Sequence, residues 1–118
     1  MDDLQVAHEA AEAGAEVIRR HFGRGIEAEW KGDVDPVTAV DREAEEAVLA
    51  VIRRRRPSDR ILAEESGGAD WREGRVWIVD PLDGTVNFVH NLPQFATSVG
   101  LRSDGQGLVG VVASVVNR

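Results

Sequence analysis

The sequence predicts an α+β fold in which two long helices precede a group of strands. Apolar residues recur with a helical period across the first half of the chain. The second half holds short apolar runs that are rich in β-branched residues and bounded by Gly, Asp and Pro, which is typical of strands. Helices first and strands second, without an internal repeat, indicates layered α+β architecture.

The first predicted helix spans residues 4–22, and its apolar or small side chains form one stripe: Leu4, Ala7, Ala10, Ala11, Gly14, Val17, Ile18 and Phe22. Gly23 and Gly25 are expected to end it. A second helix is expected to begin near residue 39, with Thr38 as its cap three residues before Asp41. We expect it to end in the arginines at 53–56, because Pro57 cannot continue a helix.

The strand candidates are short apolar segments in the second half of the chain, at residues 61–63, 76–79, 96–101 and 108–116. Residues 103–107 are expected to join the last two as a hairpin connection. Residues 66–70 are rich in Ser and Gly and predict a loop. The run at 76–79 is continuously apolar, so we expect a buried strand that ends at Asp80 and is stopped by Pro81.

The composition describes an acidic chain of 118 residues, with 14 Lys and Arg against 21 Asp and Glu and a net charge of −7. This charge argues against nucleic-acid binding, and we interpret the arginines at 53–56 as favourable charge at a helix C-terminus. The chain has no cysteine, so oxygen or imidazole must hold any metal. Because no apolar run approaches ~20 residues and the N-terminus is acidic, we expect a cytoplasmic protein without membrane contact.

The most informative segment reads Asp-Pro-Leu-Asp-Gly-Thr over residues 80–85. It places two carboxylates on a tight turn directly after a buried strand, where two like charges are costly unless a cation compensates them. An all-oxygen site of this kind suits Mg²⁺. The amides of Gly84 and Thr85 are candidates for phosphate binding, as at helix N-termini. The alternative is a plain surface turn, since Asp, Pro and Gly are also the favoured turn residues.

Three motifs in one order resemble the inositol monophosphatase family. They read Asp-Pro-Val-Thr-Ala-Val-Asp at 35–41, Ala-Glu-Glu-Ser at 63–66, and Trp-Ile-Val-Asp-Pro-Leu-Asp-Gly-Thr-Val-Asn-Phe-Val-His at 77–90. The resemblance implies a Mg²⁺-dependent, lithium-sensitive phosphomonoesterase with the layered α/β/α/β/α sugar-phosphatase fold. It covers the whole chain, residues 1–118, but corresponds to only the N-terminal portion of such an enzyme.

The resemblance also implies a set of metal ligands. Glu64, Asp80 and the backbone carbonyl of Leu82 resemble the ligands of a first metal, and Asp80 and Asp83 resemble ligands of a second. In the family a further Asp completes the second site, and we expect it in a C-terminal portion beyond Arg118.

Other positions resemble residues that act on water and phosphate. Thr85 and Asp41 would orient the attacking water, and the amides of Gly84 and Thr85 would receive the phosphate. Lys31 resembles the lysine of the family's mobile loop, although one residue fewer separates it from the next motif.

The expected reaction is hydrolysis of a small phosphate monoester, most simply myo-inositol 1-phosphate, by water activated at two metals. Histidinol phosphate, fructose 1,6-bisphosphate and 3′-phosphoadenosine 5′-phosphate are alternative substrates within the superfamily. A hypothesis of another class is a non-catalytic metal-binding or phosphate-binding module that a partner chain completes. The resemblance also implies a possible homodimer. Without a C-terminal portion, the apolar faces of Val109, Val111, Val112, Val115 and Val116 are expected to lack cover.

Overall fold

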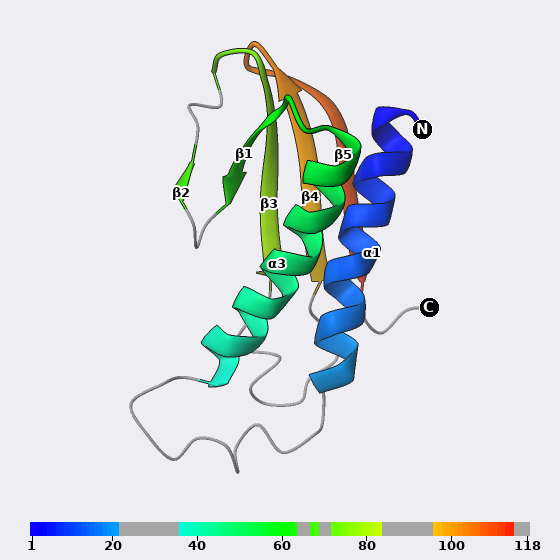
Figure 1. Cartoon of the computed structure of the whole chain (residues 1–118), viewed down its shortest axis with the longest axis vertical. Coiled ribbons are helices and arrows are strands. Elements are labelled where there is room, and N and C mark those ends of the chain that lie inside the picture. Colours follow the sequence, from blue (N-terminus) through cyan, green and yellow to red (C-terminus); the bar gives the residue numbers. More distant parts are fainter. Residues whose placement is uncertain (22–35, 64–66, 69–71, 84–95, 115–118) are drawn as a thin grey trace.

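The structure is a computed structural model and describes residues 1–21, 36–63, 67–68, 72–83 and 96–114. Its elements follow in the order α1 (Asp3–His21), α3 (Pro36–Arg55), β1 (Arg60–Ala63), β2 (Gly67–Gly68), β3 (Arg75–Asp83), β4 (Ala96–Ser103) and β5 (Gln106–Ser114) (Figure 1). Two long helices therefore precede the strands, which confirms the α+β fold class.

The strands form one mixed sheet in the order β2-β1-β3-β4-β5. Most neighbours are antiparallel, as expected, but β1 and β3 are parallel. The reason lies in β2, which the sequence pattern had assigned to a loop. This short strand runs antiparallel to β1 and carries the chain back toward the end of the sheet where β1 begins. Strand β3 therefore starts at the same end as β1 and runs parallel to it.

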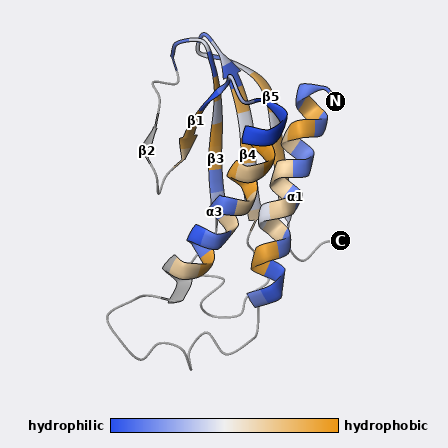
Figure 2. Ribbon diagram, viewed as in Figure 1, coloured by the Kyte–Doolittle hydropathy of each residue, from blue (hydrophilic) through white to orange (hydrophobic). Residues whose placement is uncertain are grey.

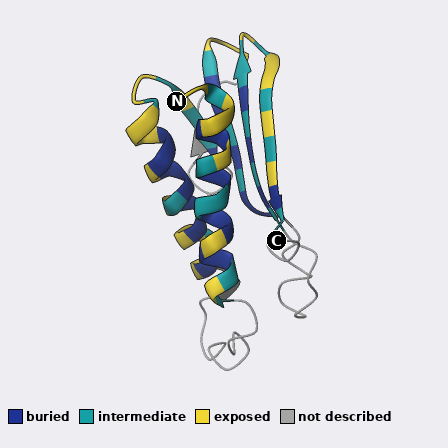
Figure 3. Ribbon diagram, turned by 90° about the vertical axis from the view of Figure 1, so that its right-hand side faces the viewer, coloured by how far each residue is buried: buried dark blue, intermediate teal, exposed yellow. Residues whose placement is uncertain are grey.

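Both helices cover one face of the sheet, and the core fills the space between the two layers (Figure 3). Helix α1 packs against α3, β4 and β5, while α3 packs against β3. The orange apolar positions in Figure 2 recur along both helices at helical spacing and alternate along the strands. The largest fully buried side chain is Trp77 of β3, beneath the helices.

Local sequence explains where the helices begin. Asp2 and Gln5 form a reciprocal cap at the start of α1, since the Gln5 amide donates to Asp2 Oδ1 at 2.8 Å and the Asp2 amide donates to Gln5 Oε1 at 2.9 Å. Helix α3 begins at Pro36, three residues before the predicted start. Thr38 therefore lies inside the first turn and not at the predicted cap position, and Pro36 stands at the first helical position, for which proline is well suited.

The carboxyl end of β3 differs from the sequence prediction. The strand does not stop at Asp80 but continues through Pro81 to Asp83. Its register against β4 shifts between Asp80 and Asp83, which marks a β-bulge. A bulge interrupts the ladder of hydrogen bonds, so a proline without an amide hydrogen is tolerated there.

The face of the sheet that lies opposite the helices carries a groove of about 310 Å³, lined in part by Ile78, Gly100 and Val112. Val112 is 68% exposed there, as predicted for an uncovered apolar face. For Val109 and Val111 that prediction was wrong, because alternation turns them toward the helices, where they pack against the core. Residues 115 and 116 lie outside the described residues. Neither described helix is long and apolar enough to span a bilayer.

Candidate functional site

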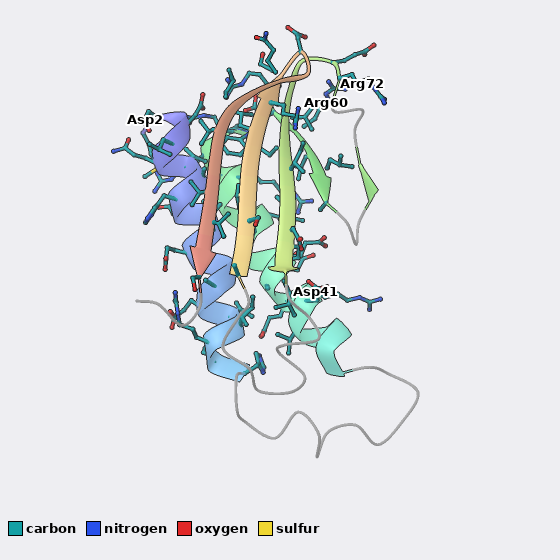
Figure 4. The ribbon with its side chains drawn as sticks, turned by 180° about the vertical axis from the view of Figure 1, so that it is seen from behind. Asp2, Asp41, Arg60 and Arg72 are labelled. Atoms are coloured by element: carbon teal, nitrogen blue, oxygen red, sulfur yellow. The ribbon has the colours of Figure 1, made fainter. Side chains whose placement is uncertain are left out.

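Acidic residues of two elements lie at one end of the molecule. Figure 4 shows Asp41 on α3 beside the end of β3, and the packing of α3 against β3 agrees with that view. Asp80 lies near the same end of β3, immediately before the bulge, and is half-buried. Leu82 is buried within the bulge. The structure thus brings three of the sequence-predicted site residues to one end of the α3 and β3 layers.

Glu45 is a buried carboxyl on α3 that the sequence interpretation missed. It lies one helical turn after Asp41 and is only 4% exposed. Asp41 Oδ1 and Glu45 Oε1 are both shielded from solvent. Glu45 directly follows Ala44 of the apolar stripe, so an acidic residue flanking the buried face was the available signal.

Several predicted site residues lie outside the described residues: Lys31, Glu64, Gly84 and Thr85. The backbone of Asp83 belongs to β3, while its side chain also lies outside the described set. Among the described side chains, no three His, Asp or Glu groups gather as a metal-binding cluster. Asp41, Asp80 and the Leu82 carbonyl offer only oxygen ligands, however, and this donor chemistry fits Mg²⁺.

The opposite end of β3 carries a second charged cluster, which is built from ion pairs. Arg75 donates to Asp59 at 3.0 Å and to Asp3 at 2.9 Å, and Arg56 also donates to Asp3, at 3.1 Å. The hydrogen bond from Arg75, more than any other contact, lowers the pKa of Asp3 below its ordinary value. Trp77 Nε1 donates to Asp59 at 2.9 Å. These bonds tie the start of α1 to the starts of β1 and β3.

Arginines within the run at 53–56 also form ion pairs with α1. Arg54 and Arg55 form ion pairs with Glu9 of α1, at 3.2 and 3.0 Å. The hydrogen bond from Arg55 lowers the pKa of Glu9. The run therefore joins the C-terminal turn of α3 to α1, in agreement with its interpretation as helix-terminal charge.

Comparison with known proteins assigns this arrangement to a family. The sequence profile of the inositol monophosphatase family matches residues 2–118. The chain belongs to the inositol monophosphatase family. The match includes all three motifs on which the sequence-based resemblance rested, so that resemblance is confirmed.

Individual members of the inositol monophosphatase family that are similar to the chain carry different names. Histidinol-phosphatase of Mycobacterium tuberculosis is 43% identical over 96% of this chain and 44% of its own length. Nus factor SuhB of Pasteurella multocida is 39% identical over 92% of this chain and 42% of its own length. The structure of an inositol monophosphatase from Zymomonas mobilis superposes with a TM-score of 0.81 at 35% identity, over 99% of this chain and 45% of that one.

This chain therefore spans less than half the length of the curated family members it matches. The shared portion contains both helices and the sheet described above, together with the motif positions at 41, 80 and 82. Members that match over this portion are named for histidinol phosphate, for inositol monophosphate and for a Nus factor. The family is thus fixed, while the substrate differs among its members.

Proposed function

We propose that this chain supplies the metal-binding half of a Mg²⁺-dependent phosphomonoesterase, with myo-inositol 1-phosphate as its substrate. The observation that carries the proposal is that Asp41 on α3 and the bulged end of β3, which bears Asp80 and Leu82, lie at the same end of the molecule. Family membership supports the same reaction class, because relatives at 43% and 35% identity are named phosphatases.

Each residue at the bulged end has a distinct role in this proposal. Asp80 and the carbonyl of Leu82 would hold Mg²⁺, with Glu64 and Asp83 as further ligands. When bound, the metal would lower the pKa of its water and neutralise charge on the phosphate. Asp41 would accept a hydrogen bond from the attacking water and fix its direction toward phosphorus, with Thr85 as a second acceptor. The amides of Gly84 and Thr85 would bind phosphate oxygens, and Lys31 would add positive charge beside them.

Histidinol phosphate is the second candidate substrate. The specific support is the Mycobacterium tuberculosis relative, which is named a histidinol-phosphatase and has 43% identity over 96% of this chain. We also propose that the chain acts in the cytoplasm on a small molecule and not on nucleic acid, in keeping with its net charge of −7. Association as a homodimer is part of the same proposal.

The test is a Mg²⁺ titration of the chain by calorimetry, followed by phosphate release from myo-inositol 1-phosphate and from histidinol phosphate. We expect saturable binding of Mg²⁺, and phosphate release from either ester should occur only when the metal is present. Asp80→Asn removes a charged ligand. Mutation of a residue that only hydrogen-bonds to a metal ligand typically costs about 10–100-fold in affinity, so we expect the Mg²⁺ affinity of this variant to fall by at least that much.

Glu46→Gln is the matched control, because it removes one carboxylate from an exposed position on α3. It should leave both Mg²⁺ affinity and turnover unchanged. A folded wild-type chain that binds no Mg²⁺ would contradict the proposal. Binding of Mg²⁺ without phosphate release would instead support a non-catalytic module that a partner chain completes.

A further inference from the structure

Thr97 is a buried polar residue of β4 that lies directly opposite the bulge of β3. It is 0% exposed and belongs to the row of alternate residues that faces the helices, together with Val99 and Leu101. A hydroxyl buried in an apolar row is costly unless it forms a hydrogen bond. Thr97 Oγ1 donates to the carbonyl oxygen of Pro81 at 2.8 Å. Its polar group is therefore committed to the bulge.

The strand register shows what this hydrogen bond holds. Asp80 pairs with Ser98, and Asp83 pairs with Ala96. Two residues of β3, at positions 81 and 82, therefore stand opposite the single residue Thr97. The extra residue of a bulge disrupts the ladder, so the Pro81 carbonyl takes its hydrogen bond from a side chain.

The bulge changes which face of the ladder the following position occupies. In a regular strand, residues three apart lie on opposite faces because successive positions alternate. Here the register partners of positions 80 and 83 are Ser98 and Ala96, which are two apart on β4 and so share one face of that strand. The bulge thereby aligns the backbone at 80 and at 83 with the same face of β4.

Helix α1 fixes Thr97 from the other side. A Cβ atom built on Gly14 would lie 2.9 Å from Thr97 Cγ2 and 2.7 Å from Val48 Cγ2. Only a residue without a side chain allows α1 to approach β4 this closely. Thr97 is therefore enclosed between α1 and the bulge, which limits its rotamers and keeps water from the Pro81 carbonyl.

From this geometry we propose that Thr97 is a positioning residue, whose hydroxyl holds the bulge in the conformation that presents Asp80 and the Leu82 carbonyl as ligands, with the backbone at 83 on the same face of the ladder. Thr97 touches neither metal nor substrate and acts through Pro81. The metal-binding step of this inference rests on the proposed function, whereas control of the bulge does not.

Three variants of the full chain test the inference. Thr97→Val keeps the branched shape and removes the donor, and Thr97→Ser keeps the hydroxyl. Val99→Ala removes packing from the neighbouring buried position on β4 without touching the bulge. Each variant is measured for thermal unfolding, for Mg²⁺ affinity, for the ¹³C shift of the Pro81 carbonyl, and for hydrogen exchange of the amides at 82 and 83.

We expect Thr97→Val to weaken Mg²⁺ affinity by about 10–100-fold, as for other residues that orient metal ligands. It should also shift the Pro81 carbonyl resonance and speed exchange at 82 and 83. Thr97→Ser should restore all three readouts, and Val99→Ala should lower the melting temperature without moving them. A purely structural role for Thr97 predicts instead that Thr97→Val and Val99→Ala behave alike, and that result overturns the inference.

The two proposals fail separately. If the wild-type chain binds no Mg²⁺, the proposed function and the metal-binding step fail together. The carbonyl shift and the amide exchange still decide whether Thr97 holds the bulge, because neither measurement needs a metal. An unchanged Pro81 resonance in Thr97→Val overturns the inference even if the wild-type chain binds Mg²⁺ tightly.

Discussion

The two ends of β3 use the same residue type for different purposes. At its amino end, near Arg60 and Arg72 in Figure 4, the carboxylates of Asp3 and Asp59 accept hydrogen bonds from arginines. At its carboxyl end, Asp80 stands at a bulge beside α3, and the hydrogen bond described there joins a hydroxyl to a backbone carbonyl. At the amino end, arginines pair with the acidic side chains. At the carboxyl end, a side-chain hydrogen bond holds the backbone next to Asp80.

This contrast teaches how stability and function are divided along one strand. Ion pairs with good geometry fix the start of β3 to α1 and to the turn before β1, so their loss should appear in the free energy of unfolding. The bulge at the other end departs from regular pairing, as is common next to active sites. Changes there should appear in ligand affinity. Each prediction below breaks or sharpens this division.

Asp59→Ala should have the largest effect on stability. Its side chain is 10% exposed and accepts hydrogen bonds from both Arg75 and Trp77. A hydrogen bond to a charged group contributes about 1.5–3 kcal/mol, and the buried Trp77 donor would lose its acceptor, so we expect a loss of about 2–4 kcal/mol. Urea denaturation measures it.

Asp59→Asn is the paired variant, since it retains an acceptor for Trp77 Nε1 while removing the negative charge. It should cost less than Asp59→Ala. Mg²⁺ affinity should stay at the wild-type value in both variants, measured well below their unfolding midpoints. A large drop in affinity would show that the two ends of β3 are not independent.

The sequence predicted the parts of the fold that depend on local periodicity. The apolar stripe from Ala7 to Ile18 predicted α1 to within one residue at either end. The hairpin of β4 and β5 was also predicted from the local turn signal at 103–107, although only Asp104 and Gly105 lie between the two strands. The sequence did not predict which side of β5 is buried. Val111 and Val112 point to opposite faces of the strand, and only the packing of the sheet against the helices determines which face is covered.

The candidate site shows the same limit more sharply. Its motif residues were found because Asp80 and Asp83 are close in sequence and resemble a known family. Pro81 was interpreted as a stop, since proline cannot donate to a ladder. The strand continues past it at a bulge, where the Pro81 carbonyl accepts a hydrogen bond from Thr97, 16 residues away in sequence. Glu45 was missed for a related reason, because its burial depends on how α3 packs and not on its neighbours in sequence.

Gly14→Ala should have an intermediate effect and should reach the carboxyl end. The added methyl would lie 2.7 Å from Val48 Cγ2 and 2.9 Å from Thr97 Cγ2, so one of these buried side chains must move. Overpacking costs about 1–3 kcal/mol, and the better helix propensity of alanine returns about 1 kcal/mol, which leaves a net loss of up to about 2 kcal/mol.

This variant sharpens the comparison because it strains Thr97 without removing its hydroxyl. The Pro81 carbonyl shift and the exchange of the amides at 82 and 83 should therefore change less than in Thr97→Val, although stability falls. Unfolding curves and the same resonance measurements decide the result.

Acidification should give the smallest effect and should act on the amino end. The pKa of Asp3 is lowered chiefly by the hydrogen bond from Arg75, with Arg56 adding to it and burial opposing it. A carboxyl whose folded-state pKa is depressed stabilises the fold above its unfolded pKa of about 3.9, and that stabilisation is lost as the pH falls through the lower folded value. The difference in unfolding free energy between the wild-type chain and Asp3→Asn should therefore be constant from pH 7 to about pH 5 and shrink below about pH 4. Urea denaturation across this range tests it, and a difference that stays constant down to pH 2.5 would show that the charge of Asp3 contributes nothing to the free energy of unfolding.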